Sequence, residues 1–437
     1  MTYEQTIKYL YDSAPVFQKI GSAAYKEGME NSFLIDKYLG EPHRHYATIH
    51  VAGTNGKGSV SHLLASVLQE AGYKTGLYTS PHLIDFRERI RVNGQMLEKE
   101  YVVGFIKQYK SFFESIKPSF FELTTGLAFS YFTDKEIDIA VIEVGLGGRL
   151  DCTNVISPIL SIITNISFDH TALLGNTLTA IAHEKAGIIK AGIPVVIGEA
   201  ESEERKVFEN IFKSTNHQTD KPSLVFAEDE KPIISSSLLS SGHWLFETKH
   251  YPHLEDELGG FAQKKNAATA LCAIEQLQIS GLKIHSENIY AGFLKVRKNT
   301  ELMGRWQIVG QQPKIILDTG HNVGGMAYNT KQLHVEKCKN LHIVFGMVND
   351  KDISAVLALM PKEAKYYFAK ASVPRALDSV ILLEKAANYG LKGEAFPTVS
   401  DALSTAKNNT SKDDVIFVGG STFVVADAIK KNCNFAR

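Results

Sequence analysis

The sequence lacks the features that would carry a protein into or across a membrane. It has no stretch of 18 apolar residues without charge, which excludes a membrane-spanning helix. The first residues, MTYEQTIKYLYDSAPVF, contain no basic segment followed by an apolar run, so they do not form a signal peptide. We therefore expect a cytoplasmic protein without a membrane partner.

Cysteine is scarce, and neither sign of charge is in excess. The 437 residues include only four cysteines, at 152, 272, 338 and 433, with no CxxC pair, which excludes a disulfide-dense scaffold and favours a reducing compartment. Lys and Arg total 47 against 48 Asp and Glu. Without a basic excess or a basic stripe interleaved with aromatic residues, we expect no nucleic-acid partner.

What is present indicates an α/β protein. Hydrophobic residues make up 44% of the chain, enough for a sizeable core. Short apolar runs rich in β-branched residues alternate with helical patterns, as expected for buried parallel strands covered by helices on both sides. The runs are 48–51, 76–79, 137–144, 160–164, 194–197, 315–317, 341–345, 365–368 and 415–418.

The chain divides into two predicted domains. Residues 263–278 and 286–296 are predicted helices, and after 298–304 a new series of strands begins with 305–309 and 314–317. We expect a large N-terminal domain, residues 1–300, with a P-loop-type, mostly parallel sheet. A smaller C-terminal α/β domain of Rossmann-like type follows at 301–437. The less regular segment 202–260 predicts a small additional sheet.

The clearest motif is TIHVAGTNGKGSVSHLLASVLQEAG, residues 48–72. A strand leads through a glycine-rich turn into a helix expected to begin at Ser59. Glycines let backbone N–H groups converge, the helix dipole favours an anion, and Lys57 adds a positive charge, so the segment predicts a phosphate-binding loop. It departs from the regular G-x-x-x-x-G-K-[ST] pattern, since Val51 replaces the first glycine and Gly58 follows the lysine. The alternative is a glycine-rich turn with an exposed lysine.

Further polar clusters follow predicted strands, where open α/β sheets bind ligands. Glu143 ends an apolar run and suits a Mg²⁺ ligand beside a phosphate loop, although it could also cap a helix. Asp169-His170 follows the next strand and Lys185 lies on a helix, with metal binding by His170 left open. Asp318-Thr-Gly-His321-Asn322 ends a strand of the second domain and predicts either a nucleotide contact or a solvated turn.

Together these motifs resemble the folylpolyglutamate synthase/dihydrofolate synthase family, a branch of the Mur ligase-like ATP-dependent amide ligases. The resemblance runs from about Gly28 to Val425. Its specific pieces are GTNGKGS (53–59), TSPHL (79–83), RERI (87–90), FELTT (121–125), EVGLGGRLDCTN (143–154), DH (169–170), EKAGIIK (184–190), Asn266, MGR (303–305), DTGHN (318–322) and FG-x4-DKD (345–352). Departures include DTGHNV for D-G-A-H-N-P and Cys152 where alanine is usual.

The resemblance implies roles for individual residues, in four sets. ATP would be bound by Asn55, Gly56, Lys57, Gly58, Ser59, Asn266, Arg305 and Asp318. Mg²⁺ would be held by Ser80, Glu143, His170 and Lys185, the lysine as an Nζ-carbamate. The pterin substrate would contact Phe121, Glu122, Leu123, Thr124, Leu150, Asp151 and Cys152. The catalytic set would comprise Lys57, Lys185, His170 and His321, which lies at a family position near the ATP.

The implied reaction joins L-glutamate to a carboxylate, with ATP cleaved to ADP and phosphate through an acyl phosphate. The acceptor is expected to be dihydropteroate, a reduced folate, or both; we predict the bifunctional form, with a one-function synthase as the alternative. We expect a monomer. A Mur ligase acting on a UDP-linked precursor is disfavoured because only about 45 residues precede the loop. A P-loop switch protein is disfavoured by the separate metal set.

Overall fold

The computed structural model describes residues 1–13, 28–217, 222–349 and 351–431. The chain forms two compact units. The first comprises Met1–Ser237, Trp244–Glu257 and Lys264–Glu301, and the second comprises Leu238–His243, Leu258–Gln263 and Leu302–Arg437. The main junction between the units therefore lies at Glu301–Leu302, and two short earlier segments belong to the second unit.

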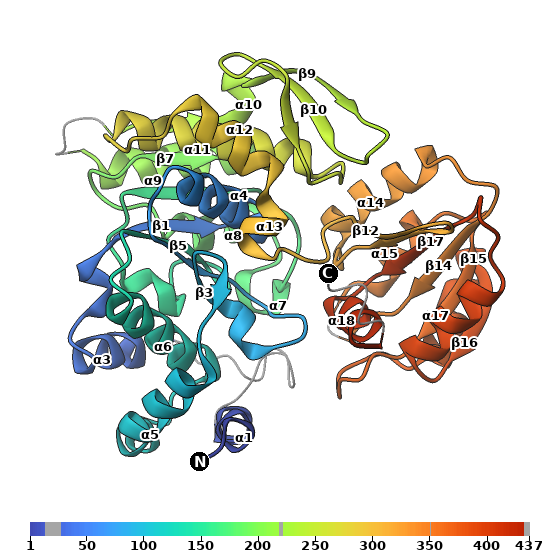
Figure 1. The fold of residues 1–437 in the computed structure, drawn as a ribbon, viewed down its shortest axis with the longest axis horizontal. Coiled ribbons are helices and arrows are strands. Elements are labelled where there is room, and N and C mark those ends of the chain that lie inside the picture. Colours follow the sequence, from blue (N-terminus) through green and yellow to red (C-terminus); the bar gives the residue numbers. More distant parts are fainter. Residues whose placement is uncertain (14–27, 218–221, 350, 432–437) are drawn as a thin grey trace. The chain divides into compact units, whose positions relative to one another are not determined.

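An eight-stranded sheet forms the centre of the first unit (Figure 1). Its strands are β1 (Ala47–Ala52), β2 (Thr75–Tyr78), β3 (Ile90–Val92), β4 (Gln95–Met96), β5 (Ile139–Glu143), β6 (Leu160–Ile163), β7 (Val195–Ile197) and β8 (Leu224–Phe226). In the order β4-β3-β2-β5-β1-β6-β7-β8, the pairs from β2 to β8 are parallel and β3 and β4 extend the edge antiparallel. The carboxyl ends of β5, β1 and β6 consequently lie side by side.

Helices and short 3₁₀ turns surround this sheet. They are α1 (Tyr3–Ser13), α3 (Glu30–Tyr38), η2 (Pro42–His45), α4 (Lys57–Glu70), η3 (Phe86–Arg89), α5 (Lys99–Ile116), α6 (Phe120–Asp134), η4 (Cys152–Val155), α7 (Thr171–Leu174), α8 (Leu178–Ala186), α9 (Ser202–Thr215), α10 (Ala227–Glu230), α11 (Gln263–Ile279), α12 (Ser286–Leu294) and α13 (Val296–Thr300). All five residues of β5 are buried. Because neighbouring residues of a strand point to opposite faces, both faces of the sheet are covered.

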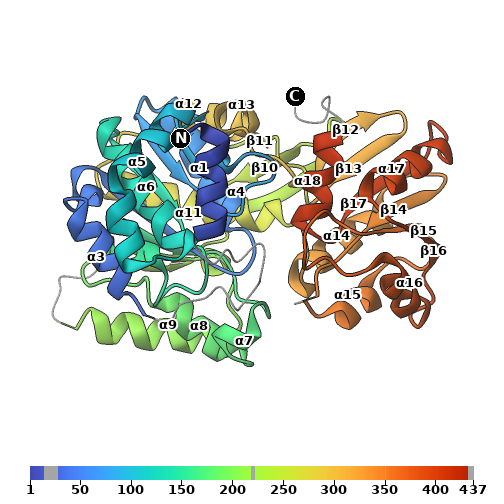
Figure 2. The ribbon, with the colours of Figure 1, turned by 90° about the horizontal axis from the view of Figure 1, so that it is seen from below.

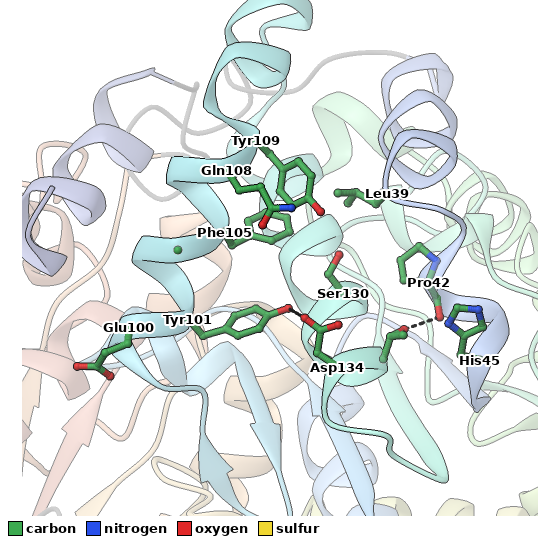
Figure 3. A pocket seen from close by; sticks show the side chains of 12 residues that line it. Leu39, Pro42, His45, Glu100, Tyr101, Phe105, Gln108, Tyr109, Ser130 and Asp134 are labelled. Carbon is green, nitrogen blue, oxygen red and sulfur yellow. Dashed lines mark hydrogen bonds between the residues drawn. The ribbon is translucent and has the colours of Figure 1, made fainter.

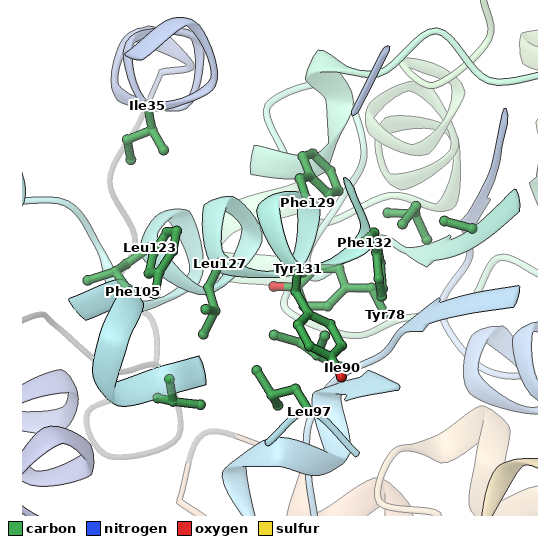
Figure 4. Close-up of a cluster of buried hydrophobic side chains, with 14 of the residues drawn as sticks. Ile35, Tyr78, Ile90, Leu97, Phe105, Leu123, Leu127, Phe129, Tyr131 and Phe132 are labelled. Carbon is green, nitrogen blue, oxygen red and sulfur yellow. The ribbon is translucent and has the colours of Figure 1, made fainter. Parts of the chain in front are cut away.

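Two apolar clusters hold the helices to the sheet. One joins α5 and α6 to β2 and β5 through aromatic side chains that include Tyr78, Phe129 and Phe132 (Figure 4). The other joins α8 and α9 to β6 and β7 around Phe208; α8 and α9 lie side by side in Figure 2. Helices α6 and α8, which carry predicted site residues, are therefore anchored by burial of apolar surface, the main stabilising term in folding.

The predicted additional sheet in 202–260 is confirmed. It contains three strands, β9 (Ile233–Leu238), β10 (Trp244–Thr248) and β11 (Leu254–Asp256), in the order β11-β10-β9. Its core-facing residues alternate with more exposed ones along β10, as expected for a sheet with one covered face.

The second unit contains a six-stranded sheet in the order β12-β13-β17-β14-β15-β16. Its elements are β12 (Gln307–Gln311), β13 (Lys314–Leu317), α14 (Val323–Val335), β14 (Leu341–Phe345), α15 (Ile353–Leu359), β15 (Lys365–Ala369), α16 (Ser379–Ala387), β16 (Lys392–Phe396), α17 (Val399–Asn408), β17 (Val415–Gly419) and α18 (Thr422–Lys431). Only β12 is antiparallel. An apolar cluster that includes Phe345, Phe368 and Phe417 forms its core.

The expected fold class is confirmed, with local differences. The helix after the glycine-rich turn begins at Lys57 instead of Ser59, because Gly56 already serves as its N-cap. The strand expected at 305–309 begins at Gln307, since Trp306 has a φ of 45° outside the strand region. Strand β16 was not predicted because it lies at the sheet edge and has no fully buried residue, so its sequence lacks an apolar run. Among the described residues, no helix is long and apolar enough to cross a membrane.

Candidate active site

The phosphate-loop segment connects the central strand β1 to helix α4. Gly56 is the N-cap of α4 with a φ of 86°, a conformation that favours glycine. A Cβ atom at this position would come within 2.3 Å of Oδ1 of Asn266, on α11. Gly58 and Ser59 follow in the first helical turn, where both are buried. The structure therefore brings Asn266 against the predicted ATP loop.

Two residues that end the neighbouring strand hold the loop in shape. Asn165 accepts hydrogen bonds from the backbone N–H of Thr54 on its carbonyl (2.9 Å) and from that of Asn55 on Oδ1 (2.8 Å). Thr164 Oγ1 donates to the carbonyl of Asn55 (2.6 Å). The sequence analysis did not assign a role to Thr164 or Asn165. The available signal was their position at the carboxyl end of the predicted strand 160–164.

Two lysines converge on one backbone carbonyl of the loop. Lys57 Nζ and Lys185 Nζ each donate to the carbonyl of Gly53 at 2.9 Å, and Lys57 also donates to that of Thr54 at 3.1 Å. Lys185 is 3% exposed. Burial, assisted by the charge of Lys57, lowers the pKa of Lys185 to about 7. The ammonium group of Lys57 at a helix N-terminus attracts anions, whereas a large fraction of Lys185 is the neutral amine at neutral pH.

The predicted metal ligands Ser80 and Glu143 meet at the carboxyl ends of β2 and β5. The backbone N–H of Ser80 donates to Oε2 of Glu143 at 2.8 Å, and Glu143 is 3% exposed. Glu143 pairs in register with Val51 of β1, one residue before the strand ends. A buried carboxylate beside a hydroxyl-bearing residue and the phosphate loop suits a hard divalent cation such as Mg²⁺.

His170 is the N-cap of α7, with a φ of 50°. Its Nε2 lies 3.8 Å from Oδ1 of Asp169, and the same Asp169 oxygen accepts the His170 backbone N–H. Asp169 also raises the pKa of Lys185, against the effect of burial, which places the two residues within electrostatic reach. Within the described ranges, no three His, Cys, Asp or Glu side chains form a ready metal cluster.

The first predicted substrate segment forms the start of α6. Ser119 and Glu122 cap this helix reciprocally: Ser119 Oγ accepts the Glu122 N–H, and Glu122 Oε2 accepts the Ser119 N–H. Leu123 and Thr124 are buried in the core. The ring of Phe121 stacks on Tyr78 at a centroid distance of 5.7 Å. Of these residues, Phe121 is the one that is only partly buried.

The second predicted substrate segment, 150–152, leads into η4. Asp151 Oδ1 accepts the N–H and the hydroxyl of Thr153, and Oδ2 accepts the N–H of Leu146 at 2.8 Å. Burial raises the pKa of Asp151. Leu150 is half-buried. Cys152 and Glu122 line one narrow crevice between α3, α6 and η4, so the structure brings the two predicted substrate segments together.

The predicted residues Arg305, Asp318 and His321 belong to the second unit. Asp318 follows β13, and its Oδ2 accepts the backbone N–H of Trp306 at 2.8 Å. Because Arg305 directly precedes Trp306, this bond also holds the backbone of Arg305 near Asp318. Oδ1 of Asp318 accepts bonds from Gly320 N and Asn329 Nδ2, both at 2.7 Å. His321 Nδ1 lies 2.9 Å from the carbonyl of Thr319. These bonds fix the turn before α14.

A larger pocket, of about 360 Å³, lies elsewhere in the first unit (Figure 3). Its lining comes from α5, the end of α6 and the segment before β1, and includes Tyr101, Phe105, Tyr109, Ser130 and Asp134. It contains none of the predicted site residues. Cys152, Cys272 and Cys338 form no disulfide in the described structure, and Cys433 lies outside the described residues.

Comparison with known domains identifies the class. Residues 51–273 match the Mur ligase middle domain, and residues 304–422 match the Mur ligase glutamate ligase domain. The protein is thus a Mur-type ATP-dependent ligase with a glutamate-adding domain. More specifically, the chain belongs to the folylpolyglutamate synthase/dihydrofolate synthase family, as the sequence analysis predicted.

Individual relatives support this assignment over nearly the full chain. The dihydrofolate synthase/folylpolyglutamate synthase of Bacillus subtilis is 33% identical, covering 90% of this chain and 92% of that protein. A probable bifunctional folylpolyglutamate synthase/dihydropteroate synthase of Haloferax volcanii is 32% identical over 98% of this chain, which spans only half of that longer protein.

Solved structures share the fold. Escherichia coli FolC in complex with DHPP and ADP has a TM-score of 0.84 and 30% identity, covering 99% of this chain and 97% of that one. A bifunctional folylpolyglutamate synthase/dihydrofolate synthase with Mn, AMPPNP and L-glutamate bound has a TM-score of 0.79 and 28% identity, covering 99% and 98%. A divalent metal and an ATP-type nucleotide are therefore established ligands of such relatives.

Proposed function

We propose that this chain is a bifunctional dihydrofolate synthase/folylpolyglutamate synthase, which joins L-glutamate to dihydropteroate and extends folate (poly)glutamates at the expense of ATP. The observation that carries the proposal is the convergence of Lys57 and Lys185 on the loop carbonyl of Gly53. The name of the Bacillus subtilis relative covers both activities. The less favoured alternatives are a synthase with one of the two activities and a Mur ligase.

The proposed chemistry begins when the acceptor carboxylate attacks the γ-phosphate of ATP and releases ADP. Lys57 would neutralise the charge that develops on the phosphate oxygens, aided by the N–H groups of Gly56, Gly58 and Ser59. The amine of glutamate then attacks the acyl phosphate, an amide bond forms and phosphate leaves. No covalent enzyme intermediate is needed, so catalysis rests on positioning and electrostatics.

The metal would be held by Ser80, Glu143 and His170, with Lys185 completing the set as a carbamate. When bound, Mg²⁺ would supply charge neutralisation for the phosphate groups. A pKa of about 7 leaves a large fraction of Lys185 as the neutral amine at neutral pH. That amine can add to CO₂, forming an N–C bond and losing a proton, which converts a buried cation into an anion suited to a metal site.

Replacing Lys185 by alanine tests this role. We expect a strong loss of the Mg²⁺-dependent rate that added bicarbonate does not restore. The matched control is Lys190→Ala, which removes a partly buried lysine shortly after α8, whose Nζ donates to the carbonyl of Asn154 at 3.3 Å. Wild-type kinetics for Lys185→Ala would overturn the carbamate assignment.

The remaining predicted residues keep their roles as proposals. Asn266 would contact the nucleotide, because its side chain lies against the loop at Gly56. Arg305, Asp318 and His321 would serve the nucleotide from the second unit, following the family resemblance. Phe121–Thr124 and Leu150–Cys152 would hold the pterin. A cytoplasmic monomer stays a prediction from the sequence.

The deciding experiment is ADP release coupled to product mass, with purified protein, ATP, Mg²⁺ and L-glutamate. Dihydropteroate and a reduced folate monoglutamate are offered separately. Products from both acceptors support the bifunctional enzyme, and a product from only one reduces the proposal to that synthase. If ATP is cleaved but neither acceptor gives a product, the result would contradict the folate specificity, and other acceptor carboxylates would then be tested.

A further inference from the structure

A buried hydrogen-bond chain connects the central strand of the first unit to the predicted pterin segment. His50 on β1 is fully buried, and its Nε2 lies 2.8 Å from Oγ1 of Thr153. Thr153, also fully buried, bonds through the same hydroxyl to Oδ1 of Asp151. The chain joins residues 103 positions apart in the sequence.

The direction of each bond follows from proton counting. Asp151 Oδ1 can only accept while the carboxyl is ionised, so the single hydroxyl proton of Thr153 is donated to it. Thr153 Oγ1 must then accept from His50, which fixes the proton of His50 on Nε2. Nδ1 consequently carries a lone pair, and it is buried without a hydrogen-bond partner in the described structure. A buried nitrogen without a partner costs stability, so the bond from Nε2 to Thr153 is the hydrogen bond that the described structure provides for the His50 ring.

The position of His50 connects this chain to the phosphate loop. His50 lies three residues before Gly53, and it pairs in register with Ile142 of β5 and Ser161 of β6. Strand β1 thus ends in the ATP loop, and the side chain of His50 on the same strand holds η4 and the segment before it. Asp151 extends the hydrogen-bond chain, because its Oδ2 accepts the backbone N–H of Leu146.

We propose that His50 is a positioning residue for the acceptor substrate: through Thr153 it fixes Asp151 and Cys152 at a set place relative to the phosphate loop. This inference rests on the proposed role of segment 150–152 in acceptor binding. The acceptor carboxylate must meet the γ-phosphate in line, and small displacements of a positioned substrate cost large factors in rate. His50 touches neither substrate, so its effect is exerted through Thr153 and Asp151.

The test compares variants that break the chain with variants that keep it. Thr153→Val and His50→Leu remove the donor–acceptor link, whereas Thr153→Ser and His50→Gln retain a hydroxyl and an Nε-type donor. We expect KM for dihydropteroate to rise about tenfold in the breaking pair, the equivalent of one lost hydrogen bond. KM for ATP should stay within about twofold. The conservative pair should recover most of the acceptor affinity.

Ser161→Ala is the matched control, because Ser161 is fully buried in the same row of the sheet but donates to Ile188 and not to the pterin segment. Thermal unfolding midpoints are measured for all variants. Equal rises in KM for ATP and acceptor, or a Ser161→Ala variant that behaves like Thr153→Val, would overturn the proposal by showing general loosening of the sheet.

A substitution of Asp151 itself distinguishes a failure of this inference from a failure of the proposed substrate site. If Asp151→Asn leaves the acceptor KM unchanged, segment 150–152 does not bind the acceptor and the proposed substrate site itself fails. If Asp151→Asn raises that KM while Thr153→Val and His50→Leu do not, the substrate site stands and the positioning role of His50 is wrong.

Discussion

Two strand-to-helix turns, one in each unit, place polar residues in the same topological position but use opposite charge. Between β1 and α4, the Nζ atoms of Lys57 and Lys185 both donate to the Gly53 carbonyl, and Lys57 carries a positive charge. Between β13 and α14, the Asp318 carboxylate accepts bonds from Trp306, Gly320 and Asn329. The turn between β1 and α4 combines the positive charge of Lys57 with backbone N–H groups that can bind an anion. In the other, a negative group is used to hold its own turn together.

The difference teaches that location at a strand end does not decide a chemical role. Both turns follow parallel strands at the edge where α/β sheets bind ligands. The first has the lysines and the left-handed Gly56 that phosphate binding needs. In the second, the Asp318 oxygens already bond three groups, so Asp318 can serve a ligand only while it also maintains the turn. Mutations at the two turns should therefore separate chemistry from stability.

The largest effect is expected for Lys57→Ala. Removing the charge at the transferred phosphate should lower turnover by at least about 10²–10³-fold. The unfolding midpoint should hardly change, because the hydrogen bonds of Lys57 to the carbonyls of Gly53 and Thr54 stay within its own loop. ADP release and thermal unfolding measure the two quantities. The control is Lys206→Ala, an exposed lysine of α9 that pairs with Glu203; normal turnover in Lys57→Ala would discard the phosphate-loop assignment.

A smaller effect is expected for Glu143→Gln, which keeps the shape of the side chain and removes its charge. If Glu143 holds the metal, the Mg²⁺ concentration for half-maximal rate should rise about 10–100-fold, the range seen for groups that support a metal site. Magnesium titration of the initial rate measures it. The comparison is Glu98→Gln, which changes a half-exposed carboxylate that pairs with Lys135. An unchanged midpoint in Glu143→Gln would remove Glu143 from the metal set.

Asp318→Ala should act on stability as well as on the nucleotide. The substitution leaves the Trp306 N–H, the Gly320 N–H and the Asn329 amide without their acceptor, which costs about 1–3 kcal/mol for a buried group left unsatisfied. Urea denaturation of the whole chain, followed by tryptophan fluorescence, measures this loss. Asp318→Asn retains an acceptor oxygen and should lose less. A fully stable Asp318→Ala would show that the two turns do not differ as described.

The smallest effect concerns pH. Burial and the charge of Lys190 lower the pKa of His50 to about 3, against about 6.5 in the unfolded chain. Between these values the unfolded state binds the additional proton, so the free energy of unfolding falls as the pH is lowered, by at most about 1.4 kcal/mol per pH unit from this group. His50→Leu removes the titrating group, and its urea midpoint should depend less steeply on pH between 6 and 4. Parallel curves for the two proteins would contradict this assignment.

Much of the architecture could be predicted from the sequence. Runs such as 341–345 are apolar at every position, and the structure has β14 at those residues. The phosphate loop was evident because its glycines and lysine adjoin such a run. The capping box of α6 was not predicted above but could have been, because Ser119 and Glu122 have the spacing that reciprocal capping requires.

Other parts of the site depend on tertiary register and could not be predicted. Thr153 meets His50 only because β5 pairs with β1 and the following loop folds back over the strand. The convergence of Lys185 with Lys57 likewise requires α8 to pack beside β6 and β7. No local pattern encodes a contact over more than 100 residues. Such contacts arise from the packing of elements whose existence, but not whose register, the sequence indicates.

The tight fit around Gly53 has a consequence for engineering. A Cβ atom there would lie 1.9 Å from Oγ1 of Thr164, and the backbone φ of 142° is one that side-chain-bearing residues rarely adopt. A library meant to change the nucleotide preference should therefore keep Gly53 and Thr164 constant. Diversity is better placed around Asn266, where a polar side chain, and not the backbone, meets the loop.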